Sequence, residues 1–124
     1  MPITYKIDRE NRIIEEKWIG TIGKDDLSDF WSSFLEDPEV LDIRRTVVDL
    51  RESQIIFTGS QLNILIQSIV IPVLKGRDWK TAIVVSAPLQ FGVSRQYQVF
   101  AEKYSQDSIF GNMEEAKSWL LKQK

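Results

Sequence analysis

The residue types that carry out most enzyme chemistry are missing from this chain of 124 residues, which contains no histidine and no cysteine. Catalytic acids and bases would have to come from Asp, Glu, Lys or Tyr. No pair of carboxylates shares a predicted helical face with the apolar surroundings that raise a pKa. The acidic group Asp25, Asp26 and Asp29 is typical of the solvated first turn of a helix. We therefore expect no enzymatic activity.

Metal and phosphate sites are not indicated by the sequence either. Metal sites need clustered His, Cys or carboxylate ligands, and no such spacing occurs. Residues 20–24 contain two glycines but lack the length and the Lys-Ser/Thr ending of a phosphate-binding loop. They are more typical of a strand-to-helix turn. We therefore predict neither a metal nor a cofactor.

A first candidate binding group is the apolar triplet Ile55, Ile56 and Phe57, which lies between a predicted strand and a predicted helix. Connecting segments are usually polar because they lie at the surface. An apolar triplet there either folds into the core or forms a contact surface. We favour burial, above all for Phe57, which is placed to form a hydrophobic staple with Leu62.

A second candidate group lies on the helix predicted for residues 59–75. At about 100° per residue, its core-facing side is predicted at Leu62, Leu65, Ile66, Ile69 and Val73. Ile64 and Ile71 project almost opposite. A helix that is apolar on both faces is either enclosed by its own protein or covered by a partner, so these two residues form a candidate subunit interface. Pro72 removes a helical hydrogen bond and could instead turn Ile71 toward the core.

The third candidate group is Phe91 with Arg95, four residues apart on a later predicted helix, where the guanidinium could stack on the ring. Their outward position follows from the stripe predicted to face the sheet, which is Leu89, Val93, Tyr97, Phe100 and Tyr104. The pair is either a binding site or part of a solvated face. Gly92, between them, indicates a close approach by another element or a ligand.

The apolar periodicity defines the elements that hold these groups. Residues 3–8 and 12–19 have strand patterns separated by a turn, which predicts an antiparallel hairpin. Later segments alternate between strands typical of a parallel sheet and amphipathic helices, at residues 45–50, 59–75, 79–86, 88–104, 107–110 and 112–120. An earlier helix, centred on residues 27–34, ends at Asp37-Pro38. The predicted order is ββαβαβαβα, an α/β fold with a mixed five-stranded sheet and four helices.

Length and composition predict one domain over residues 1–124. The 16 basic and 18 acidic residues are spread along the chain and give a net charge of −2, so no basic surface attracts nucleic acid. The N-terminus lacks the pattern of a signal peptide, and the longest apolar stretch is interrupted by Gln67, Ser68 and Pro72. We expect a cytoplasmic protein without membrane insertion.

Short motifs over nearly the whole chain carry a resemblance to a known family. They lie at the end of the central strand, at the start of a helix and near the C-terminus: Val47-Val48-Asp49-Leu50-Arg51, Phe91-Gly92-x-x-Arg95, and Phe110 with Glu115-Ala116-x-x-Trp119-Leu120. In these motifs and in its order of elements the chain resembles the SpoIIAA-like family. That family shares the STAS fold of the anti-sigma-factor antagonists, so the resemblance implies a STAS-like domain.

The resemblance also draws attention to Thr58. In the true antagonists, a serine at the start of the helix after the central strand is phosphorylated by a partner kinase, which switches binding off. The corresponding position here is Thr58, but the acidic residue that precedes the serine is replaced by Phe57. Thr58-x-x-Gln61 also has the form of a helix capping box. We therefore interpret Thr58 as a structural cap.

These observations favour a protein that works by binding. The leading hypothesis is a regulatory module that contacts a protein partner or a second copy of itself through its second and third predicted helices. The alternative is a carrier or sensor of a small apolar ligand, held in a pocket between helices and sheet that Ile55, Ile56 and Phe91 would line.

Overall fold

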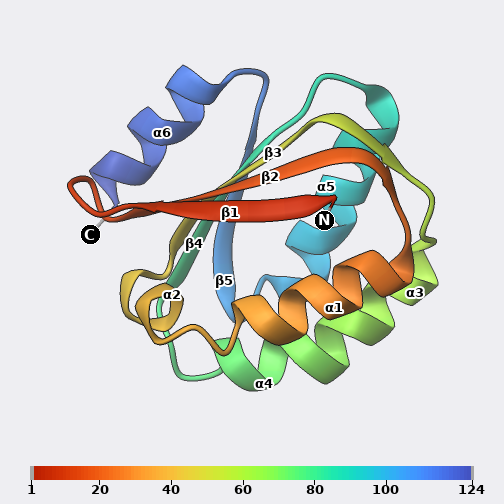
Figure 1. The fold of residues 1–124 in the computed structure, drawn as a ribbon, viewed down its shortest axis with the longest axis horizontal. Helices are drawn as coiled ribbons and strands as arrows, with labels where there is room; N and C mark the ends of the chain where they lie inside the picture. The colour runs from red at the N-terminus through yellow and green to blue at the C-terminus, as the bar shows by residue number, and fades with distance from the viewer. Residues whose placement is uncertain (1, 124) are drawn as a thin grey trace.

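The computed structural model describes residues 2–123 and has a five-stranded mixed sheet at its centre (Figure 1). The strands lie in the sheet in the order of the sequence. β1 (Ile3–Asp8) and β2 (Ile13–Ile22) form an antiparallel hairpin, and β2 runs parallel to the strands that follow, which are β3 (Arg45–Ile55), β4 (Trp79–Val84) and β5 (Ser105–Phe110). The predicted mixed sheet and its N-terminal hairpin are confirmed.

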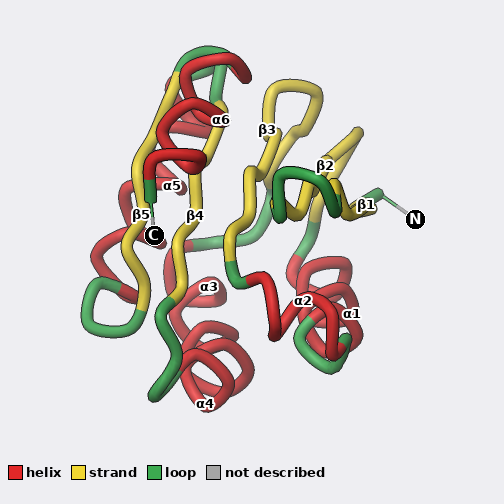
Figure 2. Tube along the Cα trace, turned by 90° about the vertical axis from the view of Figure 1, so that its left-hand side faces the viewer, coloured by secondary structure: helices red, strands yellow, loops and turns green. Residues whose placement is uncertain are grey.

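Helices cover both faces of this sheet, and Figure 2 shows the two sides in profile. One face packs against α1 (Lys24–Phe34), α2 (Pro38–Ile43), α3 (Gly59–Leu65), the π-helical turn η1 (Ile66–Val70), α4 (Ile71–Leu74) and α5 (Pro88–Ala101). The other face packs against α6 (Met113–Lys122), whose Ala116 and Leu120 meet Val47 and Val84. None of the helices within residues 2–123 has the length and apolar character needed to cross a membrane.

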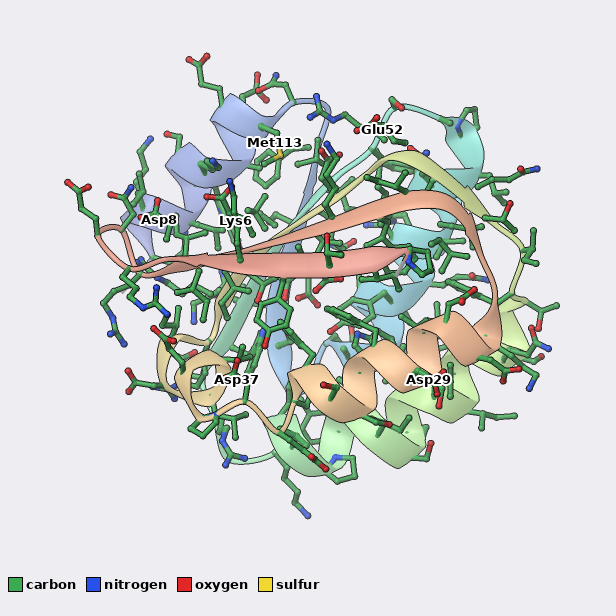
Figure 3. The ribbon with its side chains drawn as sticks, in the orientation of Figure 1. Lys6, Asp8, Asp29, Asp37, Glu52 and Met113 are labelled. Carbon is green, nitrogen blue, oxygen red and sulfur yellow. The ribbon has the colours of Figure 1, made fainter. Side chains whose placement is uncertain are left out.

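The predicted count of four helices is wrong, because a short additional helix, α2, follows α1. Pro38, which was predicted only to end the first helix, is the first residue of α2. α1 ends at Phe34, and Asp37 caps α2 by accepting a hydrogen bond from the backbone N–H of Glu39 at 2.9 Å. The Tyr5 hydroxyl donates to the second oxygen of Asp37 at 2.5 Å, and Figure 3 labels Asp37 beside α2. Proline is favoured in the first turn of a helix, where its missing N–H has no partner to lose.

The helix predicted over residues 59–75 is present, but it is widened at η1. There the N–H of Ile71 donates to the carbonyl of Ile66, five residues earlier. Pro72 has no N–H for the carbonyl of Ser68, and such a gap is accommodated by a π turn. The fully buried residues are then spaced by four, at Leu62, Ile66, Val70 and Leu74. Ile69 and Val73, which are predicted to face the core, are partly buried and pack against it, but beyond Ile66 the fully buried positions are Val70 and Leu74.

The stripe of α5 that is predicted to face the sheet is confirmed except at its start, since Val93, Tyr97, Phe100 and Tyr104 pack against the core. Leu89 was expected to face the sheet, yet it is exposed, and the buried residues of this helix include Gln90 and Ser94. The Gln90 side chain accepts a hydrogen bond from the Ser86 N–H at 2.8 Å and donates to the Ser53 carbonyl at 3.1 Å. A polar residue thereby occupies a core position, because it satisfies backbone groups at the ends of β3 and β4.

Candidate ligand-binding cavity

A cavity of about 70 Å³ lies between β2, β3 and β4 and the helices that cover them. A single water molecule needs roughly 10–15 Å³, so the cavity has room for several waters or for a small ligand. Six aromatic side chains form much of its wall: Trp18, Trp31, Phe34, Phe57, Trp79 and Tyr97. Four polar side chains also line it: Glu16, Thr46, Thr81 and Ser94. The wall of the cavity is therefore largely apolar, with a few polar groups.

The alternation of side chains along the strands sets the floor of the cavity. On β2, Glu16 and Trp18 reach the cavity, whereas Glu15 between the buried Ile14 and Glu16 points to the opposite face, where Lys117 of α6 lies 3.5 Å away. β3 contributes Thr46, Val48 and Leu50 by the same alternation. β4 contributes Trp79, Thr81 and Ile83.

A β-bulge beside Trp18 accounts for one of the motifs noted in the sequence. Lys17 pairs with Asp49, but Ile19 pairs with Glu52, so β3 carries one extra residue at this point. The Arg51 guanidinium donates two hydrogen bonds to the Asp49 carboxylate, at 2.9 and 3.0 Å. Burial acts to raise the pKa of Asp49, but these bonds and the charge of Arg51 hold it below its usual value. The Asp49-Leu50-Arg51 segment therefore has a structural role.

Glu16 is the most unusual polar group of the cavity. The residue is only 5% exposed, and its carboxyl group accepts a hydrogen bond of 2.7 Å from the indole N–H of Trp18. Burial raises the pKa of Glu16 to about 7, against the smaller opposing effect of this bond. Among residues 2–123, no Lys or Arg forms an ion pair with it. Such an acid is costly for a fold and typical of functional sites.

Polar groups continue across the sheet next to Glu16. Thr46 pairs with Thr81, and Thr81 pairs with Asp107 on β5. The Thr46 hydroxyl is buried without a hydrogen-bond partner within the described part of the chain. Burial raises the pKa of Asp107 to about 7, against the opposing effects of hydrogen bonds with the Ser105 hydroxyl, which donates at 2.6 Å, and with the Thr81 side chain. Unpaired buried oxygens are rare in folded proteins and indicate a missing partner.

Tyr97 of α5 lies close to both acids. Burial raises the pKa of its phenol well above the usual value, and the charges of Asp107 and Glu16 raise it further. These effects require both carboxyl groups to lie within electrostatic range of the phenol. Tyr97 lines the cavity, and Asp107 lines a shallow hollow at the outer edge of α5 and β5. Of the two acids, Glu16 lines the cavity and Asp107 does not.

The apolar triplet predicted from the sequence is divided by the structure. Ile55 and Phe57 are buried, whereas Ile56 is 61% exposed. Phe57 lines the cavity, and its ring lies 6.2 Å from that of Trp18 in an edge-on arrangement. The lining residues predicted for a pocket, Ile55, Ile56 and Phe91, are wrong for this cavity, because none of the three lines it.

Thr58 forms the capping box that its spacing from Gln61 indicates. Its side-chain oxygen accepts a hydrogen bond from the Gln61 N–H at 3.1 Å. The Gln61 side chain accepts one from the Thr58 N–H at 2.9 Å. This reciprocal pair of hydrogen bonds defines the start of α3. It thereby positions Leu62, the residue after Gln61, which lines the cavity.

The two groups predicted on the outward faces of helices, Ile64 with Ile71 and Phe91 with Arg95, do not line the cavity. Ile64 is 65% exposed, but Ile71 is partly buried against the protein's own core, so the two do not form one outward stripe. Phe91 is 49% exposed, and the Arg95 guanidinium donates to Gln98 at 2.9 Å. A side chain at Gly92 would meet nothing within 4 Å, which rules out a close approach by another element of the described chain.

The arrangement of sheet and helices is that of a SpoIIAA-like fold, which confirms at the level of fold the resemblance noted in the sequence. An uncharacterized protein from the DUF3478 family of Shewanella loihica PV-4, whose crystal structure has a SpoIIAA-like fold, superposes with a TM-score of 0.64. The match covers 95% of this chain and 91% of that chain at 16% sequence identity, and it therefore defines the fold alone. Neither protein-family models nor curated proteins gave a match.

Proposed function

We propose that this protein binds a small, largely apolar molecule in the cavity between β2–β4 and the covering helices. The observation that carries the proposal is an open space of about 70 Å³ with an aromatic wall inside a domain core. Protein interiors are normally packed as closely as organic crystals, and an unfilled space forfeits the contacts of its lining atoms. A ligand would restore those contacts.

Two further features of the cavity support a binding role. The Thr46 hydroxyl has no partner within residues 2–123, although it is buried in the wall. A ligand or a water molecule would supply the missing hydrogen bond. The π turn η1 also contributes Val70 to the wall. Single π turns inside α-helices occur frequently at functional sites.

Tryptophan fluorescence offers a direct test, because Trp18, Trp31 and Trp79 line the cavity. Trp119 packs on Phe110 on the opposite face of the sheet, and Trp119→Phe would remove its background signal. In that background, titration with isobutanol should give a saturable fluorescence change. The melting temperature should rise with isobutanol concentration by mass action.

A cavity-filling variant identifies the site of binding. Val48→Phe places a ring in the cavity and should abolish the saturable change, whereas Val99→Phe, the same substitution on the exposed side of α5, should leave it intact. Binding that survives Val48→Phe would place the ligand elsewhere. The absence of saturable binding by every small apolar probe would refute the proposed function.

A protein interface is a second candidate function, and the exposed side chains of Ile56, Ile64 and Phe91 favour it. Ile64→Lys should then shift sedimentation toward a smaller species without loss of stability. Gln67→Lys, an exposed position on the same helical segment, is the matched control. Identical sedimentation of the wild type and both variants would exclude a self-interface at Ile64.

A further inference from the structure

The cavity presents a carboxyl group that its surroundings do not neutralise. Glu16 receives its hydrogen bond from the uncharged Trp18 indole, and within residues 2–123 the cavity wall contains no Lys or Arg. Asp107, the other buried acid on this side of the sheet, does not line the cavity and adds no positive charge. The titratable side chain that lines the cavity beside Glu16 is the uncharged phenol of Tyr97. Within the described residues, the carboxyl group of Glu16 therefore has no cationic partner.

The aromatic side chains around this acid suit the same missing charge. Organic cations bind to the faces of Trp, Tyr and Phe, and the attraction grows when water is excluded. Trp18, Trp31 and Trp79 approach the cavity from β2, α1 and β4, and Tyr97 approaches it from α5. A carboxylate enclosed by aromatic rings on several sides is the recognition chemistry of an ammonium group.

The unpartnered hydroxyl of Thr46 fits the same type of head group. Thr46 lies on β3, two residues from Val48, which is the register partner of Glu16. Its oxygen is buried in the cavity wall and can accept a hydrogen bond. A primary ammonium has three N–H donors, so it can bind a carboxylate and a hydroxyl at the same time. An anionic ligand would instead meet the repulsion of Glu16.

From this geometry we infer that the ligand of the cavity is a small organic ammonium ion. Glu16 is its counter-ion, Thr46 accepts a second hydrogen bond, and the aromatic wall encloses both the cation and its short apolar tail. This inference rests on the proposed function and narrows it to one chemical class. Binding of the cation stabilises the carboxylate of Glu16, so a proton held there in the empty cavity is released to solvent.

Three probes that share one isobutyl group test the charge preference. Isobutylamine, isobutanol and isovalerate carry a cationic, a neutral and an anionic head near pH 7. Titrated into Trp119→Phe protein, isobutylamine should bind at least about ten-fold more tightly than isobutanol, since a desolvated cation–π contact alone reaches that size. Isovalerate should give no saturable change. The comparison needs no substitution in the cavity.

A pair of matched variants assigns the preference to Glu16. Glu16→Gln keeps the shape of the side chain and should remove the preference for isobutylamine over isobutanol. Glu15→Gln is the same change on the opposite face of β2 and should keep it. Thr46→Val should weaken isobutylamine binding by a smaller factor. Urea unfolding of each variant confirms that it is folded.

The outcomes separate this inference from the proposed function. If isobutanol binds at least as tightly as isobutylamine, or if Glu16→Gln retains the amine preference, the ammonium assignment is wrong and the apolar binding site stands. If isovalerate binds best, the sign of the required charge is wrong. If none of the three probes binds saturably and Val48→Phe has no effect on any of them, both the inference and the proposed function fail.

Discussion

Replacing Glu16 with Gln should make the stability of the protein less dependent on pH between 5 and 8. Burial raises the pKa of Glu16 from 4.5 to about 7. A carboxyl group with a higher pKa in the folded state holds its proton more tightly there than in the unfolded chain. Its effect on stability is therefore unfavourable once the pH rises above 4.5, and this effect is complete above about 7. At about 1.4 kcal/mol per pKa unit, the wild type loses roughly 3 kcal/mol through Glu16 over this range.

Urea unfolding at pH 5, 6, 7 and 8 measures this loss in the wild type, in Glu16→Gln and in the control Glu15→Gln. Asp107 also has a pKa raised to about 7 by burial, so it contributes a loss of the same sign. Glu16→Gln should therefore reduce the pH dependence by about half, and Asp107→Asn should reduce it similarly. Carboxyl groups whose pKa is lowered, such as Asp49, lose their stabilising effect only below about pH 4, outside the measured range.

One result would refute this reasoning directly. If the free energies of unfolding of wild type and Glu16→Gln fall in parallel from pH 5 to pH 8, Glu16 is not held in the folded state as an unneutralised acid. Glu16 would then require no cationic ligand as a counter-ion. If Glu15→Gln reduces the pH dependence as strongly as Glu16→Gln, the effect comes from the net charge of β2 and not from the burial of Glu16.

Two further predictions concern the helices around the cavity, and urea unfolding tests both. Thr58→Ala should lower the free energy of unfolding by about 1 kcal/mol, because it removes the side-chain acceptor for the Gln61 N–H. Thr58→Ser and Thr58→Asp should be tolerated, since both side chains can cap the helix. A partner that binds the wild type but not a folded Thr58→Asp variant would support a phosphorylation switch instead. Gly92→Ala should stabilise α5 by about 0.5–1 kcal/mol, since a Cβ there meets nothing within 4 Å. The control Gly59→Ala would place a Cβ 2.6 Å from the Gln96 side chain and should not stabilise; equal effects at both glycines would contradict the prediction.

The sequence allowed the sheet to be predicted because its strands carry local patterns. Ile3, Tyr5 and Ile7 alternate with polar residues, and the run from Arg45 to Leu50 is rich in β-branched residues. The errors occurred where such patterns are weak or overridden. α2 is too short for a helical period to be recognised. At the start of α5, the hydrogen bonds of Gln90 determine the buried face, and apolar periodicity does not include them.

The cavity could not be predicted in the same way, because it brings together side chains that are far apart in the sequence, from Glu16 to Tyr97. Glu16 lies in the charged run Glu15-Glu16-Lys17, which obscures the buried face of β2. Its position two residues from both Ile14 and Trp18 was the available signal, since alternate residues on a strand share a face. Glu16 and Asp107 lie on two strands, so no helical period relates these two carboxyl groups. Their approach to Tyr97 depends on the tertiary fold.

The sequential order of the strands has a consequence for how the cavity is assembled. Because each strand pairs with the next one along the chain, the sheet can grow from β1 to β5 without waiting for a distant segment. A nascent chain that has emerged as far as Val84 already contains Glu16, Thr46 and the three tryptophans of the wall. It lacks only the side chains of α5, which are Val93, Ser94 and Tyr97. During synthesis, the cavity would therefore be open to solvent on the α5 side until that helix packs against the sheet and closes it.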